Sequence, residues 1–501
     1  MRNSALQPGD SELTVGAQLV RAAGLSTLGS FVARGLAFVV GIYMARSLTQ
    51  FEFGSFGVLQ TSVAMISTIS GLALGVSATH YVASLRSEAP DRAAEVMRAV
   101  IAIATVSVFL ASVLVLLMAP RIASLIFTRG DLTTAVRLSG LQLVATVEFA
   151  VISGIVLGLH RFGLASVAGV VQNAAILVGV MVAAPRFGLE GALLAHGAGI
   201  VIGVAIMFFS VRHAVSDLWP RTLARAVGAQ WRALARYSLP PLFGGLVVLP
   251  AAWGSALLVT RVQPDGFQQM AYFAAADRLR LVVSFVGGFF VLALFPVLSA
   301  LVNDIDWKQS ARGLELAIVG TAALVIPTVT ALAFLGPRAM GIFGVGYAQN
   351  WEVLLLILAW ASAEALGGLF GTALLAHGRQ WLVFGQQTAF GLTLLALAFL
   401  LRELGGAGLA AAYAGATVGH LVIFMPWIAR MVRITRRGLL AAATLLVVTA
   451  LACIGSLIVS DAMRIPAAVV STVVAGVIAF SLLTADERRG LLQRLSRASS
   501  A

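Results

Sequence analysis

Residues 97–119 read MRAVIAIATVSVFLASVLVLLMA, an apolar run in which Arg98 is the only charged residue. A helix needs about 20 apolar residues to cross a bilayer. The rest of the chain has the same character, since 59% of its 501 residues are hydrophobic, 11% are charged, and the mean hydropathy is +0.96. A soluble domain carries about 25% charged residues. The composition therefore excludes soluble, disordered and fibrous proteins. It predicts an all-α polytopic membrane protein, because a membrane barrel would show alternating segments of about ten residues.

Outward from this run, similar apolar stretches recur along the whole chain. They are joined by short connections that contain Gly, Pro and charged residues, and no soluble domain is inserted. We expect about fourteen transmembrane helices, at residues 22–46, 56–84, 97–119, 138–159, 163–184, 190–211, 239–260, 268–300, 314–335, 351–376, 382–401, 407–429, 438–459 and 465–484.

The net charge of the chain is +13, from 34 Lys and Arg against 21 Asp and Glu. Topology explains this excess, because the cytoplasmic loops of membrane proteins collect Lys and Arg, so no nucleic-acid partner is predicted. With the N-terminus inside, 22 of the 34 positive residues fall on the cytoplasmic side, 9 on the opposite side and 3 within spans. We therefore expect a multi-pass protein with both termini in the cytoplasm.

The sequence predicts neither a metal site nor a cofactor. Cys453 is the only cysteine, which excludes an intramolecular disulfide and a cysteine-based zinc site. The spacing of His80, His196 and His420 suits no metal, and we expect these side chains at helix ends or in packing. No phosphate-binding loop of the Gly-x-x-x-x-Gly-Lys-Ser/Thr kind occurs.

The chain also repeats itself with an offset of about 216 residues. Six landmarks coincide or nearly coincide: Pro120-Arg121 with Pro337-Arg338, Phe127 and Gly130 with Phe343 and Gly346, Glu148 with Glu364, His160-Arg161 with His377-Gly378-Arg379, Gly188 and Gly191 with Gly405 and Gly408, and Arg46 and Phe51 with Arg261 and Phe267. We therefore expect an N-terminal six-helix half (1–215), a basic inter-half loop (216–237), a C-terminal six-helix half (238–430), and two extra helices with a basic cytoplasmic tail (431–501). Such parallel repeats enclose a substrate cavity that opens to alternate sides of the membrane.

Four stretches resemble those of a known transporter family. They are ARSLTQFEFGSFG (45–57), GLALG (71–75), AYFAAADRL (271–279) and IFGVGY (342–347). Together with the twelve-plus-two layout, they are similar to the Wzx-like flippases of lipid-linked oligosaccharides, in the multidrug/oligosaccharidyl-lipid/polysaccharide exporter superfamily. The resemblance covers nearly the whole chain.

The resemblance implies a function, a location and partners. The function is export of an undecaprenyl-diphosphate-linked oligosaccharide, such as a repeat unit of O-antigen (lipopolysaccharide), exopolysaccharide or capsule. The location is the bacterial cell inner membrane. The partners are this lipid-linked substrate, membrane lipids and a polysaccharide polymerase of the same pathway.

Three arginines inside predicted spans are the candidate substrate-binding residues: Arg34, Arg278 and Arg280. A charge in a span costs at least about 2.5–3.5 kcal/mol, so it usually faces a cavity or a partner. A guanidinium can bond a phosphate through two donors, which suits a diphosphate headgroup. Lipid II flippases also have an arginine in the first span, and the resemblance maps it loosely onto Arg34. The alternatives are a structural ion pair for Arg34 and a position at the wet end of the eighth span for the other two.

Three acids inside spans are candidates for ion coupling: Asp277, Glu148 and Glu364. Asp277 and Arg280 share a helix face at i, i+3 and can pair, whereas Arg278 points about 100° away from Asp277. The repeat gives Glu148 and Glu364 matching positions, where they could take up protons or sodium. The alternative is that they neutralise Arg34 and the arginines of the eighth span.

Other polar residues in the spans are better explained by helix packing. Gln60, Gln142, Gln172, Asn173, Gln386 and Gln387 could line a sugar cavity, but helix-to-helix hydrogen bonds use the same groups. The basic stretch from Arg212 to Arg236, with Trp219 and Trp231, fits an interfacial helix or a plain linker equally well.

Two other functions compete with the flippase. A polytopic polymerase or ligase would need a large or acid-rich outer loop, and the outer loops are short, with Glu52, Asp131, Asp265, Glu403 and Asp461 as their acids. We therefore do not expect an enzyme. A multidrug or cation antiporter on the same scaffold would favour acids and aromatic residues over arginines in its cavity.

Overall fold

Residues 29–216, 223–303, 307–377 and 379–484 are described in the computed structural model, and they form helices without any strand. Eleven of these helices are long and apolar enough to cross a membrane. The prediction of an all-α polytopic membrane protein is therefore confirmed, while the count of fourteen spans stays a prediction. Outside the described residues lie both chain ends, 1–28 and 485–501, Trp219 and the side chain of Trp231.

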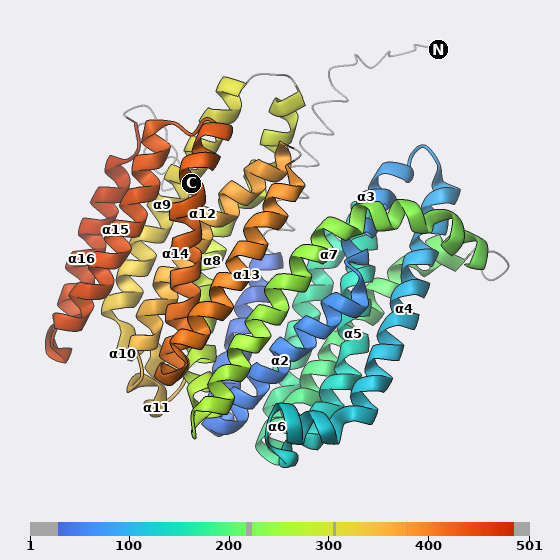
Figure 1. Cartoon of the computed structure of the whole chain (residues 1–501), viewed down its shortest axis with the longest axis horizontal. Helices are drawn as coiled ribbons and strands as arrows, with labels where there is room; N and C mark the ends of the chain where they lie inside the picture. The colour runs from blue at the N-terminus through green and yellow to red at the C-terminus, as the bar shows by residue number, and fades with distance from the viewer. Residues whose placement is uncertain (1–28, 217–222, 304–306, 378, 485–501) are drawn as a thin grey trace, which may run out of the picture. The chain divides into compact units, whose positions relative to one another are not determined.

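The chain divides into two compact units, Met1–Leu246 and Val247–Ala501 (Figure 1). The division lies within α7 (Leu223–Val262). Because α7 begins at Leu223, the second part of the stretch predicted as an inter-half loop continues as helix into the next span.

Unit 1 begins with a helix over residues 29–47. It continues through α2 (Gln50–Gly71), α3 (Leu74–Leu85), α4 (Pro90–Arg121), a π-helical turn (Ile122–Ile126), a 3-10 turn (Gly130–Leu132), α5 (Thr133–Gly158) and α6 (Phe162–Ser216). Two predicted spans, 163–184 and 190–211, fall within α6, which contains a kink at Gly188, where φ is +54°. Only glycine adopts such a φ at little cost.

Unit 2 contains α8 (Gly266–Asn303), α9 (Trp307–Phe334), α10 (Gly336–Gly341), α11 (Val345–Ala348), α12 (Glu352–Ala376), α13 (Gln380–Leu400), a 3-10 turn (Arg402–Leu404), α14 (Gly405–Met431), α15 (Arg436–Ile458), a 3-10 turn (Asp461–Met463) and α16 (Arg464–Ser481). In its interior, α8 and α12 pack against each other and both contact α9 and α14.

The second predicted span, 56–84, is broken rather than continuous. Leu72 and Ala73 separate α2 from α3 and have φ values of 49° and 52°. A close approach of α3 to α5 accompanies the break: a methyl group at Gly75 would meet the carbonyl oxygen of Ala150 at 2.7 Å. The hydroxyl of Thr79 lies 3.0 Å from the carbonyl oxygens of both Gly75 and Gly154. The prediction of one uninterrupted helix was wrong because this packing, and not local propensity, sets the backbone there.

One local geometry occurs in both units. In unit 1, the backbone N–H of Leu189, after Gly188, donates to the Glu52 carboxylate at 3.3 Å. In unit 2, the backbone N–H of Gly406, after Gly405 with a φ of +59°, donates to the Gln269 side-chain oxygen at 3.4 Å. The sequence offset between the two sets is the one read from the repeated landmarks, so this geometry supports the duplication.

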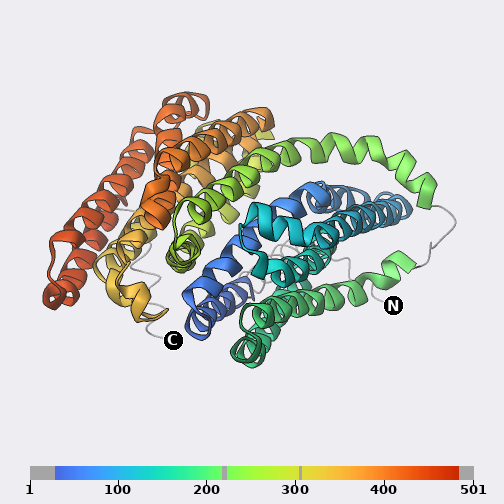
Figure 2. The same ribbon diagram turned by 60° about the horizontal axis from the view of Figure 1, so that its bottom comes forward.

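The two C-terminal helices, α15 and α16, both pack on α9 (Figures 1 and 2). At one end, Arg437 donates to Glu315 of α9 at 2.9 Å and to the carbonyl oxygen of Leu482 at 2.7 Å. At the other end, Arg464 donates to Asp461 at 2.8 Å, and its guanidinium lies 4.3 Å from the ring centre of Trp351. Arginines therefore connect this helix pair to the rest of unit 2 at both ends.

Candidate functional site

The clearest cluster of charge lies in unit 2, around Arg280 of α8. Its Nε donates to Asp277 at 2.6 Å, one helical turn away, and its Nη1 donates to Glu364 of α12 at 2.6 Å. Ser284 donates to the same Glu364 oxygen at 3.0 Å. The arginine side chain is only 13% exposed, against 29% for Asp277 and 41% for Glu364. The expected i, i+3 pairing of Asp277 with Arg280 is thus present, and Glu364 joins it.

Aromatic rings complete this cluster. The Arg280 guanidinium lies 4.1 Å from the ring centre of Trp360, which stacks on Tyr413 of α14 at 4.2 Å. Phe273 lies beside both rings, at 6.4 Å from Trp360 and 5.7 Å from Tyr413. Sequence reasoning missed all three aromatic residues, because an aromatic residue in an apolar span normally indicates nothing beyond packing.

The contacts of Arg280 limit its ability to bind a phosphate. One cation faces two carboxylates and a ring, so the cluster of Arg280, Asp277 and Glu364 carries more negative than positive groups. A phosphate would have to compete with both carboxylates for this guanidinium. The guanidinium of Arg280 is therefore already occupied by protein groups in this arrangement.

Arg278 occupies a different face of α8. Two residues along a helix turn the side chain by about 200°, which directs Arg278 away from Arg280. Its face also carries Leu281 and Val282, which are exposed. Arg278 is half-buried, and in the described part of the chain it forms no hydrogen bond or ion pair, although the adjacent Asp277 acts on it electrostatically.

The two candidates in unit 1 lie on separate helix pairs. Arg34 is exposed on the helix 29–47, which packs on α6 through contacts such as that of Ala33 with Gly169. Glu148 of α5 accepts a hydrogen bond from Thr105 of α4 at 2.5 Å. Its partner is therefore a neutral hydroxyl, whereas Glu364, at the matching position of the repeat, is paired with an arginine.

Several of the polar side chains form helix-to-helix bonds. Gln60 and Gln142 exchange amide hydrogen bonds at 3.2 and 3.0 Å, and Gln142 also contacts Nδ1 of His196 at 3.1 Å. Asn173 donates to a carbonyl of its own helix. Within the described part of the chain, the remaining glutamines form no such bond. The side-chain oxygen of Gln172 and the side-chain nitrogen of Gln386 are buried without a hydrogen-bond partner among the described residues, and Gln387 is exposed. The described residues contain no group of three or more metal-ligating side chains.

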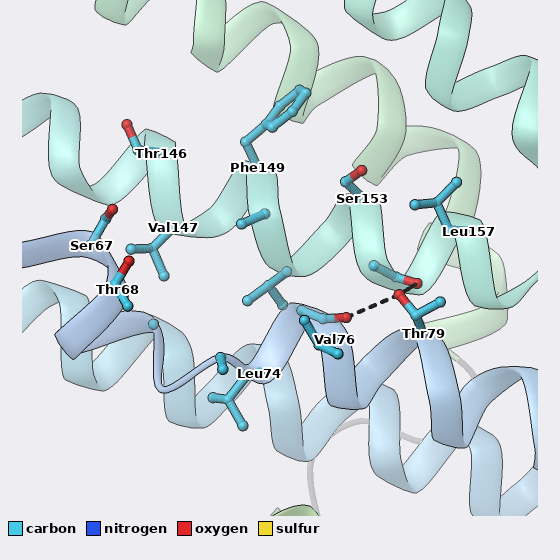
Figure 3. A pocket seen from close by; sticks show the side chains of 16 residues that line it. Ser67, Thr68, Leu74, Val76, Thr79, Thr146, Val147, Phe149, Ser153 and Leu157 are labelled. Atoms are coloured by element: carbon cyan, nitrogen blue, oxygen red, sulfur yellow. Dashed lines mark hydrogen bonds between the residues drawn. The ribbon is translucent and has the colours of Figure 1, made fainter. Parts of the chain in front are cut away.

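A cavity of about 610 Å³ lies at the break between α2 and α3 (Figure 3). Its walls are the two half-helices and α5. Sequence reasoning missed it. The only available signal was the pair of glycines in GLALG (71–75), which flank the residues with positive φ.

Comparisons with known proteins give the same class of protein. The model of a family described as "Polysaccharide biosynthesis protein" matches residues 19–302. The EPS I polysaccharide export inner membrane protein EpsE of Ralstonia nicotianae is 22% identical over 400 residues, which cover 77% of this chain and 89% of that protein.

Solved structures show the same fold. The lipid II flippase MurJ in an inward closed conformation is 14% identical, with a TM-score of 0.72 over 91% of this chain and 99% of that chain. An inward-facing multidrug resistance transporter of the MATE family is 16% identical, with a TM-score of 0.65 over 79% of this chain and 94% of that chain. These relatives carry the names of export proteins, flippases and transporters rather than of enzymes, in agreement with the prediction.

Proposed function

Because the chain belongs to the family of polysaccharide biosynthesis proteins, we propose that it is a flippase of the bacterial inner membrane. Its substrate would be an undecaprenyl-diphosphate-linked oligosaccharide, a repeat unit of a surface polysaccharide. The export protein among its relatives and the shared fold with a lipid II flippase support this assignment.

The observation that carries the proposal is Arg278, an arginine in a span with no hydrogen bond or ion pair in the described part of the chain. Leaving such a group without a ligand is costly in a membrane. A diphosphate supplies the missing acceptors, and a guanidinium binds phosphate through two parallel hydrogen bonds. We assign Arg278 to the substrate, with Arg34 as the second cation, from unit 1. In this proposal the two arginines line a cationic cavity that opens alternately to each side of the membrane.

Arg280 takes a different part in this proposal. Since Asp277 and Glu364 occupy it at 2.6 Å each, it contacts phosphate only after one of them is protonated. Glu364 and Asp277, together with Glu148 in unit 1, are then the groups that couple transport to ions. Both termini would lie in the cytoplasm, and a polymerase on the opposite side would receive the exported unit.

One observation favours a second function, export of cationic drugs. The cluster around Arg280 combines two carboxylates with Phe273, Trp360 and Tyr413, and an aromatic and acidic site suits an organic cation. The fold similarity to multidrug transporters fits it as well. Against it, Arg280 already occupies the carboxylates, and Arg278 would repel a cation.

The test is replacement of Arg278 by Ala in host cells whose surface polysaccharide can be measured. We expect surface polysaccharide to fall more than tenfold and lipid-linked intermediates to accumulate inside, with an unchanged amount of protein in the membrane. The matched control is Arg186→Ala, which removes a positive charge from an exposed position, where the guanidinium donates to the carbonyl oxygen of Val182. Normal polysaccharide in the Arg278→Ala cells would contradict the proposal. Sensitivity to cationic drugs in cells that lack the whole protein, together with normal polysaccharide, would support the second function.

A further inference from the structure

The cavity at the break between α2 and α3 has no part in the phosphate and ion roles assigned above. Its described lining residues all belong to unit 1, and among them none is Asp, Glu, Lys, Arg or His. Its volume of about 610 Å³ lies in the range of pockets that hold small ligands, about 300–1,000 Å³. A ligand that enters it must therefore be recognised without charge.

Hydroxyl groups supply the polar part of the walls. They belong to Ser67, Thr68, Thr79, Thr146 and Ser153. Ser67, Thr68 and Thr146 donate to carbonyl oxygens of their own helices, at 3.0, 3.1 and 3.0 Å. Because each hydroxyl has one proton and two lone pairs, these oxygens remain available as acceptors. Ser153 has no hydrogen bond in the described part of the chain, so its hydroxyl can both donate and accept.

The broken backbone adds donors. Helix α3 begins at Leu74 without a side-chain cap. The first N–H groups of a helix have no partner inside it, although that of Val76 already donates to the carbonyl oxygen of Ala73 at 3.2 Å. Non-helical backbone is tolerated at membrane depth where it is buried in protein or lines a cavity. Ala73, Leu74 and Gly75 line this cavity, so the break presents main-chain groups to whatever occupies it.

Apolar side chains form the rest of the walls, among them Val76, Val147, Phe149 and Leu157 (Figure 3). A metal cation would be matched by carboxylates and a phosphate by Lys or Arg, and neither kind of residue occurs in the described part of the wall. A pyranose ring combines hydroxyls at its rim with C–H groups on its faces, which suits walls of this mixed kind.

We propose that this cavity is a saccharide subsite that takes a sugar ring of the exported headgroup. The inference rests on the proposed flippase function. It adds that two separate sites bind the substrate: the arginines bind the diphosphate, and an uncharged cavity in unit 1 binds the sugar. Substrate preference would then depend on residues such as Ser153 and Thr146 rather than on the arginines.

Cysteine accessibility tests this subsite. Cys453 is the only cysteine, so Cys453→Ala provides a background in which Ser153→Cys or Thr146→Cys is the single thiol. The purified full chain in nanodiscs is labelled with a small maleimide, alone and with four probes. These are undecaprenyl diphosphate and the same lipid carrying N-acetylglucosamine, glucose or galactose. Ser124→Cys, exposed on the outer turn, is the control thiol.

We expect both cavity thiols to be labelled, and at least one sugar-bearing lipid to slow that labelling about tenfold, while undecaprenyl diphosphate and the control thiol show no such effect. The subsite is overturned if neither cavity thiol reacts, if no sugar-bearing lipid slows the reaction, or if the carrier without sugar slows it equally. Direct binding of undecaprenyl diphosphate to the same preparation, with and without Arg278→Ala, tests the flippase proposal separately. Retained carrier binding without sugar protection would defeat the subsite alone.

Discussion

At the scale of single residues, Arg280 stands between two carboxylates and the Trp360 ring, and all three contact it. Removing one partner of a buried ion pair leaves an uncompensated charge, which costs more than the pair itself contributes. A stability measurement can therefore test the role of Arg280 in holding α8 to α12 without a transport assay.

We expect Arg280→Ala to destabilise the protein by up to about 3 kcal/mol, less than a fully buried pair because Glu364 is 41% exposed. Adding Glu364→Gln should restore part of this loss, since the double variant leaves only Asp277 charged. Thermal unfolding in one detergent, at fixed pH, measures both. Additive effects of the two substitutions would contradict a direct coupling between Arg280 and Glu364.

The residue scale also shows where sequence reasoning stops. The pairing of Asp277 with Arg280 could be predicted because helix geometry puts i and i+3 on one face. The contact of Glu364 was left as one of two alternatives, since spacing along a chain does not tell which helices are neighbours. Trp360 and Tyr413 could not be predicted as members, because their neighbours come from α8, α12 and α14 together.

At the scale of elements, the apolar pattern predicted nearly all helices, because about 20 apolar residues determine a span whatever surrounds them. It did not predict the break between α2 and α3. Leu72 and Ala73 are good helix formers, and their left-handed backbone depends on how α3 meets α5. Only a tertiary contact distinguishes such a span from a continuous one.

Glycine substitutions test the backbone of this break. A non-glycine residue at positive φ costs about 1 kcal/mol or more, so Leu72→Gly and Ala73→Gly should leave the Tm unchanged or raise it. The control is Ala111→Gly in the regular helix α4, which should lower stability by about 0.5–1 kcal/mol. A Tm that falls in all three variants to the same extent would indicate that α2 and α3 form one helix.

The contact that holds α3 on α5 gives a second test. A methyl group at Gly154 would collide with the carbonyl oxygen of Gly75, so Gly154→Ala should destabilise unit 1 by about 1–3 kcal/mol. Gly367→Ala in α12 is the matched control, because nothing lies within 4 Å of its added methyl. Equal unfolding temperatures for the two variants would mean that the helices do not approach as closely as described.

At the scale of the whole molecule, the sequence predicts a duplication, and some pairs of positions can be compared directly. Phe127 and Phe343, which coincide under the offset, are both buried, at 2% and 0% exposure. The backbone N–H of Arg161 bonds to the carbonyl of Val156 as that of Arg379 does to Leu374. The halves nevertheless differ in chemistry, since Glu148 meets a hydroxyl and Glu364 an arginine. A repeated pattern thus predicts backbone geometry better than it predicts charge partners.

Topology can be tested on the same scale. The charge bias of 22 cytoplasmic against 9 outer Lys and Arg predicts both termini inside. Green fluorescent protein fused to either end should fluoresce, and alkaline phosphatase inserted after Asp131 or Glu403 should be active. Activity of a phosphatase fused to the C-terminus would contradict an even number of spans with the N-terminus inside.

The arginines at the two ends of α15 and α16 have a mechanical consequence. Arg437 binds Glu315 of α9, and Arg464 lies on the ring of Trp351, which directly precedes α12. The two C-terminal helices therefore cannot slide along the rest of unit 2 without losing contacts at both of their ends. The two helices would therefore move with the rest of unit 2 as one rigid body during any rocking motion. A fluorophore on an exposed position of α16 would then report the position of the whole of unit 2. Distances measured from it would follow the transport cycle rather than local motion of the helix.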